Sequence, residues 1–544
     1  MKFNISNMTV ALAAAALGAA SCTANYEDIN RNPYEVTAED MERDGYAMRS
    51  FMTTMQSWVI PADVNQCQFT DLLLGGPYGG YIADANSGFN TGKFSTYDPQ
   101  SNWSPVFYRV IYTNEMSNFT ELCKVTEDEN AIAVAKVVKV AGVHRVADTY
   151  GPIPYTQVGT GADPVPLDSE KEVFKAMFAD LDAAVEVLTR NRAGMITTDA
   201  DRLYGGSLER WGRLANSLKL RLAMRIVYTD FTTDDGRTPQ QLAEEAVSSE
   251  LGVIEDNSGN AMYTGFGKDG NPLYTACMYN SPAGSVTGGD SHAAADIICY
   301  MNGYEDPRRE KYFSKAQFSG DNALEYVGMR RGIAIPALST VGLLYSGVNF
   351  VDGMATPLQW MNAAEVAFLK AEAVGVFGWN MGGSAKTFYE QGVRLSFEQW
   401  GVAGVDEYLV GTTLPESYTD PNGGATSYST QLSQLGVAWN DSASKEEMQE
   451  RIIIQKWIAN FHLGNEAWAD FRRTGFPHLI PAMESAVGNN SQGIRNLTLG
   501  ARRMSYPADE ATNNPENYAK AVEMLGGSDN MATRMWWDCN PAVK

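Results

Sequence analysis

Aromatic, amide and carboxylate side chains gather in three glycine-containing stretches of this sequence. A sugar ring has an apolar face that stacks on aromatic rings, and a rim of hydroxyls that amides and carboxylates bind. The three stretches therefore offer residue types that suit a carbohydrate-binding surface, and loop packing onto a scaffold is the alternative reading. The candidate residues are Tyr78, Tyr81, Asp84, Phe89, Tyr274, Tyr279, Asn280, Tyr345 and Asn349.

Residues for covalent, phosphate or metal chemistry form no recognisable motif. The sequence has no GxSxG, P-loop or HExxH pattern, and its four histidines are widely spaced. We therefore expect no enzyme activity, no cofactor and no histidine-built metal site, while a structural calcium ion stays open. The 65 acidic residues leave a glycosidase pair of facing carboxylates as an alternative that no motif marks.

The cysteines divide into one near the N-terminus and five in the body of the chain. The five are far apart and form no CxxC pair, so we expect mostly buried free thiols, with one or two disulfides as the alternative. They are Cys67, Cys123, Cys277, Cys299 and Cys539.

The first 22 residues, MKFNISNMTVALAAAALGAASC, have the layout of a secretory signal followed by a lipobox. A short apolar run ends in small residues directly before Cys22, and it is too short to span a bilayer. We predict that residues 1–21 are removed and that Cys22 carries the lipid anchor. An ordinary signal peptide with a chance cysteine is the alternative.

The net charge argues against a nucleic acid partner, and the hydrophobicity argues against a membrane-spanning helix. The 544-residue chain has a formal net charge of −23, which does not suit phosphate neutralisation, so we expect no nucleic acid partner. No segment after Cys22 approaches the roughly 18 uninterrupted apolar residues of a membrane-spanning helix. The protein is therefore expected to be tethered to a membrane without crossing it.

Helical periodicity dominates the rest of the chain. Apolar residues recur every three or four positions in 169–191, 210–227 and 362–378, and one long helix is predicted through 444–475. Ser169 and Glu172 are spaced as a capping box. Between these helices lie long stretches rich in glycine, asparagine, tyrosine and proline. The pattern predicts a mostly α fold with paired helices and large irregular loops.

Six blocks of the sequence resemble the SusD/RagB family of nutrient-binding outer-membrane lipoproteins, in the family's order. They are CTANYEDINRNP, ADTYGPIPYTQ, RWGRLANSLKLRLAMRI, WMNAAEVAFLKAEAVGVFGW, IIIQKWIANFHLGNEAWADFRRTGFP and RRMSYPADEATNNPENYAKAV. The resemblance implies a SusD-like helical scaffold with tetratricopeptide-like helix pairs over residues 22–544, of which 22–40 form a tether. Glu27 and Asp28 resemble the signal that routes such lipoproteins to the outer face of the outer membrane.

The same resemblance implies a role and partners. Family members capture a nutrient, usually an oligosaccharide, and act as a lid on a SusC-like TonB-dependent transporter at the cell surface. A peptide cargo, a surface glycosidase and an adhesive protein are the alternatives. Arg472, Arg473 and Glu466 could bind an acidic substrate, but internal ion pairs explain them as well. Trp211, Trp457 and Trp468 are expected in the core.

Overall fold

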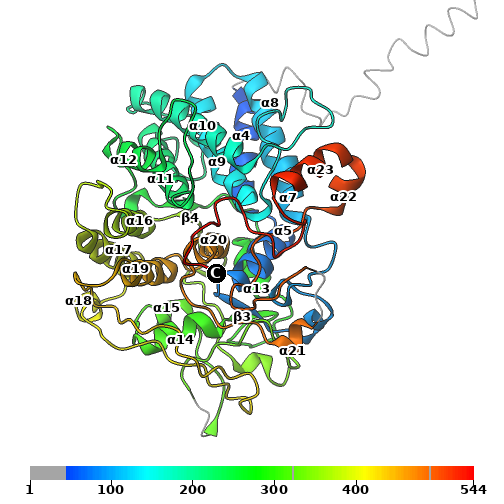
Figure 1. Cartoon of the computed structure of the whole chain (residues 1–544), viewed down its shortest axis with the longest axis vertical. Coiled ribbons are helices and arrows are strands. Elements are labelled where there is room, and N and C mark those ends of the chain that lie inside the picture. The colour runs from blue at the N-terminus through cyan, green and yellow to red at the C-terminus, as the bar shows by residue number, and fades with distance from the viewer. Residues whose placement is uncertain (1–44, 321–323, 489–491) are drawn as a thin grey trace, which may run out of the picture. The chain divides into compact units, whose positions relative to one another are not determined.

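Two groups of packed helices form the scaffold in the computed structural model, which describes residues 45–320, 324–488 and 492–544. The first group is α9 (Glu129–Tyr150), α10 (Glu170–Arg190), α11 (Leu208–Arg225) and α12 (Pro239–Ser248), each packed on the next. The second is α16 (Ala363–Gly375), α17 (Ala385–Gln399) and α19 (Lys445–Ala459), and α16 packs against both others. Figure 1 shows the first group in cyan and green and the second in yellow-green to orange. The prediction of a mostly α scaffold built from helix pairs is confirmed.

The two groups and the elements that follow α4 (Tyr46–Val59) belong to the unit Met48–Lys544. No described helix is long and apolar enough to cross a membrane. The predicted signal 1–21, the lipidation at Cys22 and the tether 22–40 lie outside the described residues. The other α-helices are α4 (Tyr46–Val59), α5 (Val64–Cys67), α6 (Gly76–Tyr78), α7 (Val106–Ile111), α8 (Ser117–Val125), α13 (Pro272–Cys277), α14 (Ala295–Gly303), α15 (Arg309–Tyr312), α18 (Val405–Leu409), α20 (Gly464–Thr474), α21 (Glu484–Val487), α22 (Ala508–Asn513) and α23 (Pro515–Met524).

Helix starts follow the sequence signals. The Ser169 hydroxyl accepts a hydrogen bond from the Glu172 amide at 3.3 Å, which is the first half of the predicted capping box. The Glu172 carboxylate lies instead 3.3 Å from Lys175 Nζ, one turn further along the helix. In α11 the predicted stripe, including Trp211 and Leu218, is buried as expected.

The long helix predicted through 444–475 is wrong in one respect, because it is two helices. α19 ends at Ala459 and α20 begins at Gly464, and His462 between them has a φ of +80°. Gly464 lies so close to the backbone of Gly75 that a Cβ atom would sit 2.3 Å from the Gly75 carbonyl carbon. The break turns α20 onto the segment that precedes α6, and only glycine permits this approach.

Short strands fasten the long loops to one another. In the described chain, β1 (Ile82–Asp84) pairs antiparallel with β3 (Ser291–Ala293), and β2 (Ala261–Tyr263) pairs antiparallel with β4 (Leu358–Met361). The first pair joins the loop region around residue 82 to the loop region around residue 291. The second places the 262 region beside the segment that leads into α16.

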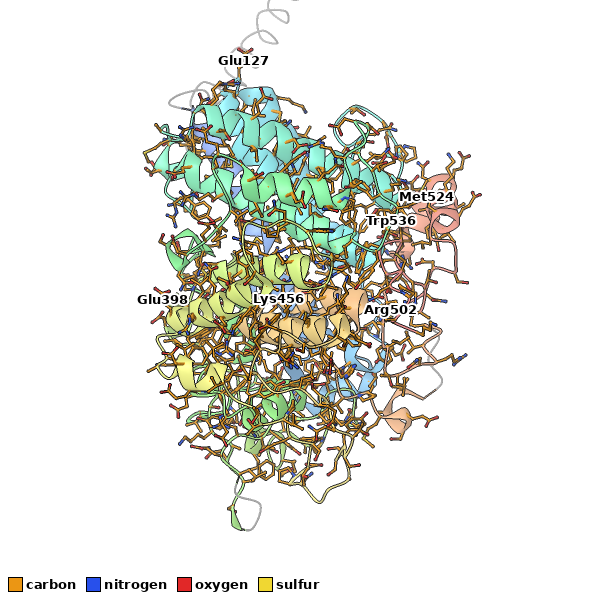
Figure 2. The ribbon with its side chains drawn as sticks, turned by 60° about the vertical axis from the view of Figure 1, so that its left-hand side comes forward. Glu127, Glu398, Lys456, Arg502, Met524 and Trp536 are labelled. Atoms are coloured by element: carbon orange, nitrogen blue, oxygen red, sulfur yellow. The ribbon has the colours of Figure 1, made fainter. Side chains whose placement is uncertain are left out.

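Buried ion pairs connect the helices at the centre of the molecule. Arg221 of α11 binds both carboxylate oxygens of Glu365 of α16, at 2.7 and 2.6 Å. Arg225 of α11 binds Glu466 of α20 at 2.6 Å, and Lys456 of α19 lies 2.7 Å from Asp470 of α20. Figure 2 labels Lys456 on α19, near the middle of the molecule. These pairs hold four helices in fixed relative positions, because separating them would strand buried charges.

The described cysteines are free, as predicted. Cys67, Cys277 and Cys299 are buried, whereas Cys123 and Cys539 are exposed. Burial raises the pKa of the Cys277 thiol to about 12, so this group stays protonated and packs as a small apolar side chain.

Glu170, the first residue of α10, provides a pH-dependent prediction. Its buried carboxylate accepts a hydrogen bond from the Trp536 amide at 2.9 Å, and burial raises its pKa from 4.5 to about 8. Between pH 4.5 and 8 the unfolded chain loses this proton while the folded chain keeps it. The free energy of unfolding should therefore fall with rising pH, by up to about 1.4 kcal/mol per pH unit from this group.

Glu170→Gln is expected to remove this fall in the free energy of unfolding with rising pH. The stability of the variant relative to the natural protein should rise from pH 5 to pH 8 and level off above pH 8. Thermal unfolding midpoints measured at each pH test this expectation. A difference between the two proteins that is the same at every pH would contradict it.

Candidate functional site

A cavity of about 210 Å³ lies beside the break between α19 and α20. The break supplies Phe461 and His462, the end of α17 supplies Trp400, and strand β4 supplies Gln359. The loop before β4 contributes Phe350. The neighbouring Val351 and Asp352 are exposed, so the cavity opens to the surface along this loop.

Aromatic rings form the walls of this cavity and hold one another in place. The ring centroids of Tyr274 and Phe350 are 5.5 Å apart, edge to face, and those of Phe350 and His462 are 4.8 Å apart. Behind them, Tyr312 lies 4.5 Å from both Phe461 and Trp400. Ring pairs at these separations stabilise each other beyond the area that they bury, so the wall is preformed.

Three polar nitrogen atoms of the cavity lining are buried without a hydrogen-bond partner. They are Gln359 Nε2, Trp400 Nε1 and His462 Nε2. The Gln359 carbonyl oxygen accepts a hydrogen bond from Gln399 Nε2 at 2.7 Å, which fixes the amide and leaves its NH₂ group without a partner. Because a buried donor without a partner costs free energy, these atoms would gain from a bound molecule that carries acceptor oxygens.

Desolvation sets the charge of the histidine. It lowers the pKa of His462 to about 3, so the imidazole is neutral at physiological pH. A neutral ring has one N–H donor and one acceptor nitrogen. Apart from the Asp352 carboxylate at the exposed mouth, the lining therefore combines ring faces with uncharged hydrogen-bonding groups, which can bind a hydroxyl-rich molecule.

Asn271 joins the two loops around the mouth of the cavity. Its side-chain oxygen caps α13 by accepting from the amides of Leu273 and Tyr274, at 2.8 and 3.1 Å. Its NH₂ group donates to the Thr356 carbonyl at 2.8 Å, and its backbone N–H donates to the Met354 carbonyl at 2.8 Å. Tyr274 is thereby held against the loop that carries Phe350.

Five of the residues predicted from the sequence are partly or fully exposed. Tyr274 lies at the aromatic wall, and Asn349 precedes Phe350 in the same loop. The Tyr279 hydroxyl is 3.3 Å from Asn65 Oδ1. Asn280 donates to Asp290 at 2.8 Å, and Phe89 packs edge to face on Trp103. The structure therefore brings the 274 and 349 stretches together, and these residues remain candidates for ligand contact.

The other four predicted residues are buried, with 1–4% of each residue exposed. The Tyr78 hydroxyl donates to the Phe94 carbonyl at 3.0 Å, and the Tyr81 hydroxyl donates to the Trp457 carbonyl at 2.5 Å. Asp84 accepts from Ser95 at 2.7 Å, and Tyr345 donates to Asp420 at 2.7 Å. Packing covers these side chains and satisfies their polar atoms, so this structure gives them a structural role and leaves no ring face open to a ligand.

The main cavity residues escaped the sequence analysis for identifiable reasons. Phe461 and His462 fell inside the predicted continuous helix, and Trp400 stands at the end of a helical stretch where an aromatic suggests core. Asn460 and Gly464 around the pair are a helix-end signal that could have revealed the break.

One group of described residues has the composition of a metal site. Ligand atoms of His144, Asp148 and Glu466 lie within 4.8 Å of one another in the core. Arg225 binds both carboxylates, at 3.1 Å to Asp148 and 2.6 Å to Glu466. Because the guanidinium already occupies the place of a cation between the two acids, the group is an ion-pair cluster and does not fit a metal ion. Arg473 and Arg472 are also buried in internal contacts, as the alternative reading of the sequence proposed.

Comparisons with known proteins agree with this architecture. A family model described as "Susd and RagB outer membrane lipoprotein" matches residues 28–538. No curated protein matches the chain. A solved SusD homologue from Bacteroides uniformis is 48% identical in sequence, with a TM-score of 0.84, and the match covers 91% of this chain and 100% of that chain.

Two further solved structures extend the comparison. A SusD homologue from Bacteroides ovatus is 38% identical, with a TM-score of 0.83, and the match covers 91% of this chain and 100% of that chain. A chitin-binding SusD homologue from Flavobacterium johnsoniae is 33% identical, with a TM-score of 0.82, and the match covers 91% of this chain and 99% of that chain.

Proposed function

Because this chain belongs to the SusD and RagB family of outer membrane lipoproteins, we propose that it is a non-catalytic surface protein that captures an oligosaccharide. The observation that carries the proposal is the cavity beside His462, whose lining residues combine aromatic rings with three buried nitrogens that have no hydrogen-bond partner. The chitin-binding relative is a family member with a glycan ligand and supports the same class of cargo.

Binding at this site combines stacking with hydrogen bonding. A sugar ring lies against Phe350, which Tyr274 supports edge to face, and its hydroxyl or carbonyl oxygens accept from the lining donors. Each aromatic contact contributes about 0.5–1.5 kcal/mol beyond the area buried, and each hydrogen bond exchanges with water. We therefore expect dissociation constants in the micromolar to millimolar range, with tighter binding for longer chains that also reach Tyr279.

Delivery is the second part of the proposal. The lipid on Cys22 holds the protein at the outer face of the outer membrane, where it passes the captured chain to a SusC-like TonB-dependent transporter. Weak binding suits this step because the cargo must be released. Co-purification of the transporter with the lipidated protein from detergent-solubilised outer membranes tests the partnership, and recovery of the protein without any transporter would contradict it.

Tyr274→Ala is expected to weaken oligosaccharide binding about three- to tenfold, because it removes the ring that holds Phe350 in the cavity wall and so costs about one aromatic contact. Titration calorimetry with a polysaccharide that the natural protein binds measures the effect. The matched control is Tyr518→Ala, which removes a half-buried tyrosine on α23 whose ring packs on Tyr506, away from the cavity lining. Equal affinity in all three proteins would remove Tyr274 from the site.

The absence of catalysis is tested with the same protein. Incubation with the bound polysaccharide should produce no new reducing ends. Turnover that persists through repurification would show an enzyme and would overturn the proposal.

A further inference from the structure

We propose that the cavity beside His462 selects uncharged glycans and rejects acidic ones, an inference that rests on the proposed function. Among the residues that the structure describes, the cavity lining includes no lysine and no arginine. Its ionisable side chains are the carboxylate of Asp352, which lies at the exposed mouth, and the imidazole of His462. A uronic acid or sulfated sugar would therefore lose water at its charged group without gaining a cation.

The neutral state of the interior follows from its composition. Desolvation keeps the His462 ring uncharged, and the other polar groups of the lining, apart from the Asp352 carboxylate at the mouth, are amides, one indole N–H and one hydroxyl. Proteins bind carboxylates and sulfates with arginine or lysine, because a charged acceptor needs charge-assisted hydrogen bonds to offset its desolvation. Neutral donors suit hydroxyl, ether and acetamido oxygens, which cost much less to desolvate.

The surroundings of the cavity add repulsion. Asp63 and Asp269 lie near Tyr279, since both carboxylates raise the pKa of this tyrosine in addition to its burial. Lys268 precedes Asp269 but is exposed and does not line the cavity. The whole chain carries a formal charge of −23, so an anionic chain meets an unfavourable field as it approaches at low salt.

Matched pairs of glycans separate charge from linkage. Cellohexaose, chitohexaose and maltohexaose are titrated into the purified protein, together with a β-1,4-linked glucuronic acid hexamer that differs from cellohexaose only at C6. Affinity gels with galactan, galacturonan, mannan and alginate widen the range of linkages. We expect binding within the neutral set, and an affinity for the glucuronic acid hexamer that is at least about tenfold lower than for the neutral hexamer that binds most tightly.

The outcomes distinguish the two proposals. If an acidic glycan binds as tightly as its neutral partner, or binds when no neutral glycan does, charge selection is wrong while glycan capture stands. If no glycan in the set binds but a peptide does, the proposed function and this inference both fail.

A charge reversal at the mouth tests whether discrimination between neutral and acidic glycans occurs at this cavity. Asp352→Lys exchanges the one carboxylate of the lining for an ammonium group, and Asp230→Lys makes the same exchange at an exposed position outside the lining. We expect Asp352→Lys to strengthen binding of the acidic hexamer about three- to tenfold at low salt, with the gain lost at high salt. The Asp230→Lys variant should not differ from the natural protein. Equal responses of the two variants would show that selection comes from overall charge and not from this cavity.

Discussion

Replacing Arg473 with alanine is expected to lower the free energy of unfolding by about 3–5 kcal/mol. The Arg473 guanidinium is fully buried and binds both oxygens of Glu372, at 2.6 and 2.8 Å, and one oxygen of Asp470 at 2.9 Å. Removing the arginine leaves two carboxylates in the core with fewer positive partners. The expected loss is the cost of stranding these charges, which exceeds the strength of any one hydrogen bond.

A surface pair provides the control for Arg473→Ala. Arg190 lies 2.6 Å from Glu129, the same separation as in the buried pair, but about half of each side chain is exposed. Arg190→Ala should cost less than about 1 kcal/mol, because water replaces the lost partner. Urea unfolding of both variants measures the difference. Adding Glu372→Gln to Arg473→Ala should restore part of the stability, and no restoration would contradict the explanation by stranded charge.

Tyr81→Ala is expected to cost about 3–5 kcal/mol of unfolding free energy, as large aromatic deletions in a core do. The ring stacks on Trp457 with centroids 5.6 Å apart and meets Phe461 edge to face at 5.5 Å. The side chain therefore supports the back of the cavity without facing it. Tyr81→Phe keeps the ring and removes one hydrogen bond, so it should cost only about 0.5–1.5 kcal/mol.

The contrast with Tyr274 separates scaffold from site. Tyr274→Ala should change stability by less than about 1.5 kcal/mol, since the ring is only partly buried, while weakening glycan binding. Urea unfolding and calorimetric titration of both variants give the comparison. If Tyr81→Ala is as stable as the natural protein but no longer binds glycan, then Tyr81 contacts the ligand. In that case the ring cannot be buried in the bound protein.

The helices could be predicted because their signals are local. Ser169 and the apolar stripe of α10, or Trp211 and the stripe of α11, lie within a few turns of one another in the sequence. The break at His462 could not be read from periodicity, because apolar residues continue at helical spacing on both sides of it. Its cause is the contact of Gly464 with Gly75, which are far apart along the chain.

The chemistry of the site could be predicted better than its location. Tyr81 and Tyr274 both follow turn-forming residues and both read as loop aromatics, yet one is covered by Trp457 and Phe461 and the other is not. Which ring face stays open depends on long-range packing, which single-residue patterns do not encode. The cavity itself joins segments from residue 60 to residue 462, so its donors could not be grouped from the sequence.

Calorimetric titration of Trp400→Phe beside the natural protein tests whether the aromatic cavity with neutral donors captures glycan. The substitution keeps an aromatic ring against Tyr312 and removes the unpartnered indole N–H. We expect a glycan to bind the natural protein, and to bind the folded variant about two- to tenfold more weakly. A glycan that binds both proteins equally would place the ligand elsewhere, and binding of no glycan by either would contradict the account.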